Sequence, residues 1–159
     1  MKRVSFGLIL SLLLLLPLSS FAAACDQVWF HVAGVSKHVE VYKPTEFTRY
    51  KRQTHPGFGV ECKKKQYTLA AGEFTNSLDR PFQYLTASTD IASFYNLRLK
   101  AGMLVGEYGR TERAPLRLIA PIAYLDYQYD QVGINFFALP PAQGVNDYAI
   151  FYTQFKIRF

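Results

Sequence analysis

The C-terminal segment AIFYTQFKIRF constrains the fold more than any other part of the chain. Its side chains alternate at a period of two, which is the period of a β-strand. One face carries Ala149, Phe151, Thr153, Phe155, Ile157 and Phe159, and the other mostly Tyr152, Gln154, Lys156 and Arg158. A soluble sandwich would explain the alternation but does not need a terminal aromatic residue. Closing strands of outer-membrane barrels typically end on one, so the segment predicts such a strand.

The residue types between residue 24 and this C-terminal segment also favour strands. The chain after residue 24 has no convincing amphipathic helix, and the whole sequence holds 13 Phe and 11 Tyr, which are strand-forming residues. Turn signals divide it into eight segments at 27–41, 57–63, 66–74, 82–89, 94–108, 116–127, 132–139 and 148–159. A closed barrel satisfies every backbone polar group within lipid, whereas an open sheet does not. We therefore predict an all-β fold, an eight-stranded antiparallel up-and-down transmembrane β-barrel, with a soluble lipocalin-like barrel as the alternative.

The N-terminal segment has the three regions of a secretory signal peptide. Lys2 and Arg3 precede a long apolar run, and small residues follow up to Ala24. We expect residues 1–24 to be a signal peptide and residues 25–159 to form one outer-membrane β-barrel in the bacterial outer membrane. In that oxidising compartment Cys25 and Cys62 can form a disulfide. The sequence leaves a free or lipid-acylated Cys25 open as well.

The net charge of +6 and the pI near 9.3 indicate which classes of molecule the protein could bind. Basic residues cluster at 49–52 and 63–65. For an exported protein these clusters favour anionic lipid headgroups or lipopolysaccharide phosphates over nucleic acid, although solvated loops explain them equally well. No group of His, Cys or carboxylate residues has metal-ligand spacing, so no metal and no cofactor is expected. We expect a membrane-embedded monomer.

The predicted topology brings one possible catalytic pair together. With both termini in the periplasm, the outward-facing connections are 42–56, 75–81, 109–114 and 140–147. His38 near the outer end of the first strand and Ser77 at the Asn76-Ser77 hairpin tip then reach the same membrane face. A hydroxyl beside an imidazole is the minimum arrangement for proton transfer in acyl transfer. His31 lies low in the first strand, and His55 is expected in the long first loop.

Several motifs together resemble the outer-membrane lipid A palmitoyltransferase (PagP) family. They are a histidine at the top of the first strand, here His38, a basic loop running into a Gly-Phe-Gly strand, here RYKRQTHPGFG, and a strand ending EFTNS. The segment APLRLIAPIAYLDY, with Pro115 and Pro121, is similar to the family's proline-marked sixth strand. INFFALPP and the aromatic last strand also correspond. The resemblance covers most of the chain after residue 24.

The resemblance implies an acyltransferase that moves an acyl chain from a phospholipid to lipid A. His38 would be the general base, Ser77 would position the acceptor hydroxyl or stabilise developing charge, and Asn76 would orient the histidine. The barrel interior would hold one acyl chain if small residues line it. Pro121 removes one ladder donor, and in the family such seams admit lipid sideways.

Two departures from the family leave the enzymatic activity open. Asn76 stands where the family has a catalytic aspartate, and an amide cannot stabilise an imidazolium as a carboxylate does. In the serine protease template the corresponding change costs about four orders of magnitude in turnover, unless Asp79 or Glu73 supplies the acid. The family also has an amphipathic helix before the first strand, which is not visible here. The alternative is a non-catalytic barrel of the same fold that binds lipid or a surface partner.

Overall fold

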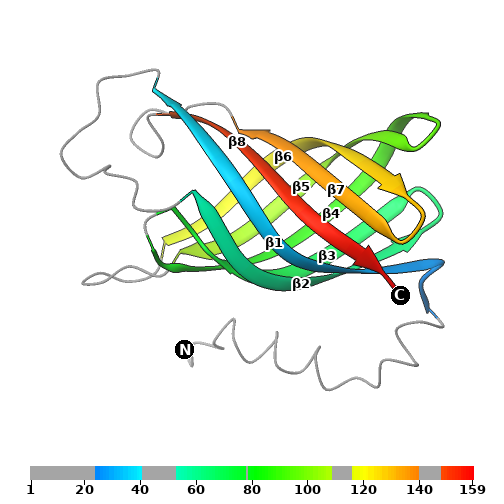
Figure 1. Cartoon of the computed structure of the whole chain (residues 1–159), viewed down its shortest axis with the longest axis horizontal. Helices are drawn as coiled ribbons and strands as arrows, with labels where there is room; N and C mark the ends of the chain where they lie inside the picture. The colour runs from blue at the N-terminus through cyan, green and yellow to red at the C-terminus, as the bar shows by residue number, and fades with distance from the viewer. Residues whose placement is uncertain (1–23, 41–52, 78, 109–115, 140–147) are drawn as a thin grey trace.

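The computed structural model describes residues 24–40, 53–77, 79–108, 116–139 and 148–159. Its strands are β1 (Gln27–Glu40), β2 (Thr54–Lys64), β3 (Tyr67–Thr75), β4 (Pro81–Phe94), β5 (Leu97–Tyr108), β6 (Leu116–Tyr129), β7 (Val132–Leu139) and β8 (Tyr148–Arg158). Each strand pairs antiparallel with the next, and β8 pairs with β1, so the sheet closes on itself. Figure 1 shows the strands tilted around the long axis of the barrel. The predicted eight-stranded up-and-down barrel is confirmed.

Two-residue hairpins mark one end of the barrel, which we call the terminal end because β1 begins and β8 ends there. Lys65, Tyr95 and Asp130 open these turns with φ values of 54°, 51° and 51°. Tight hairpins require such left-handed backbone. The predicted fifth strand, 94–108, was therefore wrong at its start, because Phe94 ends β4 and Tyr95 turns the chain. The predicted end of the fourth strand at Thr89 was also wrong.

The opposite end, which we call the His38 end, holds the connection from β3 to β4. The second strand begins earlier than predicted, at Thr54, so placing His55 in a loop was wrong. Pro56 pairs with Ala33 next to a register irregularity in β1. Prolines are tolerated in strands at such bulges, which explains why the proline misled the prediction. No helix in the described ranges is long and apolar enough to cross a membrane.

The barrel is apolar outside, and many of its inward-facing side chains are polar or charged. In β8, Gln154 and Lys156 are buried in the interior while Phe155 and Ile157 point outward, as the alternation predicts. Outward-facing apolar residues recur on the other strands and include Val35, Phe58, Leu69, Leu85, Leu99, Met103, Ile119 and Leu125. Exposed aromatic residues gather at the terminal end, namely Tyr67, Phe94, Tyr95, Tyr129 and Phe159. An apolar outer band beside an aromatic girdle is the polarity of a membrane-spanning barrel.

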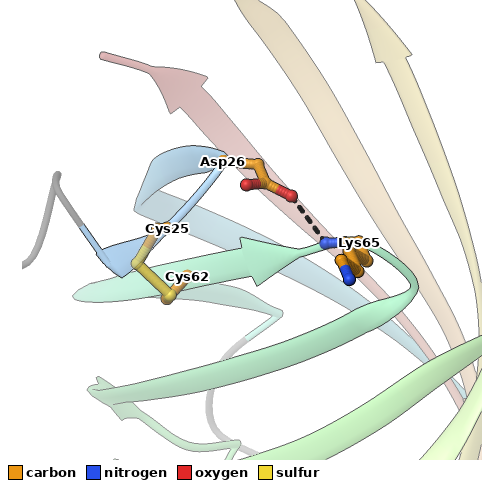
Figure 2. The surroundings of a disulfide bond; sticks show 4 residues. All are labelled: Cys25, Asp26, Cys62 and Lys65. Atoms are coloured by element: carbon orange, nitrogen blue, oxygen red, sulfur yellow. Dashed lines mark hydrogen bonds between the residues drawn. A yellow bond between two sulfur atoms is a disulfide. The ribbon is translucent and has the colours of Figure 1, made fainter.

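A disulfide fastens the segment before β1 to β2. Cys25 and Cys62 are bonded, with their Cα atoms 5.5 Å apart. Beside the disulfide, the Lys65 backbone N–H donates to Asp26 Oδ2 at 2.7 Å, as Figure 2 shows. The disulfide alternative is therefore confirmed, and it leaves no Cys25 thiol for acylation. The predicted signal peptide lies outside the described residues, apart from Ala24.

Candidate functional site

His38 and Ser77 meet at the His38 end of the barrel. Ser77 Oγ lies 3.0 Å from His38 Nε2, although the residues are 39 positions apart in sequence. His38 is partly buried near the end of β1, opposite Ile150 of β8, and Ser77 lies just beyond β3 in the connection to β4. The predicted proximity of the imidazole and the hydroxyl is confirmed. Their catalytic role stays a prediction.

Asn76 shapes the turn that carries Ser77. Its backbone N–H donates to the Arg80 carbonyl at 2.7 Å, and its side-chain oxygen accepts from the Arg80 N–H at 3.1 Å. The Asp79 N–H donates to the Asn76 carbonyl at 3.0 Å. An amide does this as well as a carboxylate, so Asn76 has a structural role of its own. Its role in orienting His38 stays a prediction, while Glu73, a suggested substitute acid, accepts from Gln83 on the outer side.

Behind His38 lies a connected set of hydrogen-bonding groups. Ser36 Oγ is 3.5 Å from His38 Nδ1 and 2.7 Å from His55 Nε2, and His55 Nδ1 is 2.7 Å from the carbonyl oxygen of Thr75. We call the groups of Ser77, His38, Ser36, His55 and Thr75 the histidine relay. Ser36 and His55 are both buried. Neither was predicted as a site residue, although Ser36 and His38 share a strand face by their spacing of two.

Below the relay, aromatic rings fill the interior. Their residues, the aromatic collar, are Phe74, Phe82, Tyr84, Tyr124, Phe137 and Tyr152. Ring centroids lie 5.3 Å apart for Phe74 and Tyr152 and 4.6 Å apart for Tyr124 and Phe137. Gly59 carries no Cβ where the Tyr84 hydroxyl comes close. The void against the collar measures about 10 Å³, close to the least that one water needs. These rings occupy the space where the prediction required small residues around an acyl chain.

The terminal half of the interior is ionic. Acidic and basic side chains alternate in contact, and this charged layer runs through Glu61, Lys156, Asp126, Lys100, Asp90 and Lys63. Its N–O distances range from 2.8 to 3.3 Å, and the side chains of Lys100 and Asp126 are fully buried. His31 joins the layer to the collar, because its ring nitrogens lie 2.7 Å from Tyr84 Oη and 3.3 Å from Glu61 Oε2. Within the predicted basic cluster 63–65, the Lys63 ammonium is paired with Asp90 inside the barrel, while Lys64 and Lys65 are exposed. Binding of anionic headgroups by this cluster stays a prediction. The other predicted basic cluster, 49–52, lies outside the described residues.

At the His38 end, two of the described ladders are shorter than the strands that carry them, and we call these two places seams. The β1–β2 ladder ends at the pair Val35 and Thr54, although β1 continues to Glu40 beside β8. The β6–β7 ladder ends at Tyr124 and Phe137, and among the described strands the part of β6 that contains Pro121 pairs with β5. The predicted weak seam at Pro121 stays a prediction.

Comparison with known proteins gives little beyond this geometry. No family model matches the chain, and no curated protein matches it. Among solved structures it is similar to the N-terminal β-barrel domain of OprF from Pseudomonas aeruginosa, with 12% identity and a TM-score of 0.48, over 85% of this chain and 98% of that one. The closed barrel therefore rests on the strand pairing of the chain itself. Among the described residues, no group of three His, Cys, Asp or Glu could hold a metal ion.

Proposed function

We propose that this chain is an outer-membrane acyltransferase that moves an acyl chain from a phospholipid to a hydroxyl of lipid A at the His38 end. The observation that carries the proposal is the 3.0 Å contact between Ser77 Oγ and His38 Nε2 in a barrel with an apolar outer surface. A general base must lie within hydrogen-bond reach of the proton that it takes. The apolar surface favours a bilayer, where both lipids are found.

In the proposed reaction, His38 Nε2 takes the proton of the acceptor hydroxyl. The acceptor oxygen forms a new ester bond to the acyl carbonyl carbon of the phospholipid. The old ester bond breaks, and the glycerol oxygen of the leaving lysophospholipid receives the proton from His38. Ser77 holds the acceptor hydroxyl against the imidazole, and its own hydroxyl stabilises the charge that develops. The proposed reaction involves no cofactor.

The two seams supply routes for the lipids. One runs beside His38, where β1 extends beyond its pairing with β2, and the other runs along the Pro121 part of β6. Because the collar rings fill the adjacent interior, we propose that the acyl chain approaches along a seam from the bilayer. This differs from a chain stored in an open chamber.

Mass spectrometry of lipid A from cells that express the chain tests the proposal. We expect one added acyl chain with the wild-type protein and its loss with His38→Asn or Ser77→Ala, by a factor of about 10² to 10⁴ in rate. Ser93→Ala, an exposed hydroxyl at the terminal end of β4, is the matched control and should leave the product unchanged. Heat-dependent electrophoretic mobility checks that each barrel is folded. A folded wild-type barrel that adds no acyl chain would refute the proposal.

A second candidate is a non-catalytic barrel that binds lipid or a surface partner. The amide of Asn76 favours it, because this residue has a complete turn role and lacks the charge that supports an imidazolium. Asn76→Asp separates the candidates. Acyl transfer that appears or rises in this variant favours the enzyme, whereas an inactive wild type and an inactive, folded variant favour the binding protein.

A further inference from the structure

The histidine relay ends on a group that can only accept a hydrogen bond. His55 Nδ1 lies 2.7 Å from the carbonyl oxygen of Thr75, the last residue of β3. A carbonyl has no proton to give, so this ring nitrogen must carry one. In a neutral imidazole the other nitrogen, Nε2, is then an acceptor. The Thr75 carbonyl therefore fixes the tautomer of His55.

The order of donors and acceptors extends from His55 through Ser36 to His38. The Ser36 hydroxyl is 2.7 Å from His55 Nε2 and must donate its proton to that acceptor. Ser36 Oγ is left with lone pairs, and these favour the proton on the nitrogen that faces it, His38 Nδ1, at the longer separation of 3.5 Å. His38 Nε2 is then unprotonated and faces Ser77 Oγ at 3.0 Å. Every donor in the series points away from the Ser77 hydroxyl and toward the Thr75 carbonyl.

Packing holds the far end of the relay in place. The His55 side chain is 2% exposed, and its ring contacts Tyr152 and Phe74 at centroid distances of 5.6 and 5.9 Å. Ser36 is 7% exposed, and its backbone N–H donates to the Gln53 carbonyl at 2.7 Å. Such a supported shell keeps a histidine in one orientation, as partners on the second ring nitrogen do in other proteins.

We infer that Ser36 and His55 are positioning residues, which set the tautomer of His38 from the Thr75 carbonyl and thereby present a basic Nε2 to the Ser77 side of the site. In this way a serine and a second histidine take over the tautomer-selecting part of a carboxylate's role. They supply no negative charge. The catalytic consequence rests on the proposed acyltransferase function, whereas the tautomer itself does not.

Nitrogen-15 NMR of the refolded, detergent-solubilised chain tests the tautomers directly. The chain has three histidines, and single His→Asn variants assign them. At about pH 8, where free imidazole is neutral, we expect His38 and His55 to be protonated on Nδ1. Ser36→Ala should redistribute the His38 proton between both nitrogens. His31, which is held by Tyr84 and Glu61, should keep its signature and serves as the internal control. A wild-type His38 protonated on Nε2, or a His38 signature that Ser36→Ala leaves unchanged, would overturn the inference.

Kinetics on the same proteins test the positioning role. We expect Ser36→Ala to lower kcat about ten- to a hundredfold with little change in KM, the range found for partners that orient a histidine at metal sites. Ser36→Thr keeps the hydroxyl and should restore most of kcat. His55→Phe keeps the ring contacts but removes both nitrogens, and it should match Ser36→Ala.

The two proposals fail in different ways. A wild-type barrel without acyl transfer refutes the proposed function, and the NMR result then decides the tautomer inference alone. An active wild type whose kcat is unchanged by Ser36→Ala and His55→Phe refutes the positioning role. A loss of kcat that Ser36→Thr does not restore also counts against it, because the hydroxyl would not be the group that matters.

Discussion

The charged layer and the aromatic collar fill the two halves of one barrel by different physics. In the layer, six ionised side chains alternate in contact, and their interaction is strong only while every partner is present. In the collar, neutral rings pack tilted or stacked, and each contact contributes separately. Removal of a single charged side chain from the layer should therefore destabilise the fold strongly. The collar tolerates shape-conserving changes.

This difference explains why the candidate chemistry lies at the His38 end. A proton-transfer site needs neutral groups that can exchange donor and acceptor roles, as imidazoles and hydroxyls do. The ions of the layer have fixed roles: its ammonium groups only donate, and its carboxylates only accept. Lys156, Glu61 and Asp126 also close the terminal half of the interior. In the proposed reaction, the lipids would therefore have to approach the relay from the His38 end or along the seams.

The largest expected effect comes from breaking the charged layer. Lys156 bonds Glu61 at 2.8 Å and Asp126 at 2.9 Å, so Lys156→Met leaves two buried carboxylates short of a partner. We expect it to lower the free energy of unfolding by about 3–5 kcal/mol. Denaturant titration in lipid vesicles measures this. Lys64→Met, at an exposed position of β2, is the control, and a similar loss in both variants would contradict the contrast between interior and surface.

A change in the collar should have a smaller effect. Phe74 packs against the rings of Phe82, Tyr84 and Tyr152, and Phe74→Leu keeps an apolar side chain of similar bulk. We expect a loss of about 1–1.5 kcal/mol, from the missing ring contacts and a small volume change. The same titration measures it. A loss as large as that of Lys156→Met would show that the two halves do not differ as argued.

Much of the barrel could be predicted from the sequence because each strand alternates at a period of two. The β8 pattern gives its inward and outward residues, and strand parity places His38 and Ser77 at one end. Strand ends were harder to predict. Tyr95 has the side chain of a strand residue but the backbone of a turn, and the bulge between Asp90 and Ala92 interrupts the alternation in β4.

The relay and the charged layer could not be predicted because they depend on contacts between distant strands. His55 reaches Ser36 only because β2 begins before Pro56, and a proline usually indicates the opposite. Lys63 looked like part of a surface cluster with its lysine neighbours. Its partner Asp90 lies 27 residues away, and only the closed barrel brings the two together.

The smallest expected effect compares the buried ion pairs with an exposed one. Arg117 Nε lies 3.2 Å from Glu107 Oε2 on neighbouring strands, and the arginine side chain is 69% exposed. Because solvent screens such a pair, Arg117→Ala should lower the free energy of unfolding by less than about 1 kcal/mol. Titration at low and high salt sharpens the comparison, since the effect of Arg117→Ala should shrink with salt while that of Lys156→Met should persist. Equal salt responses in the two variants would mean that water and ions reach Lys156, and that the charged layer does not close the terminal half of the interior.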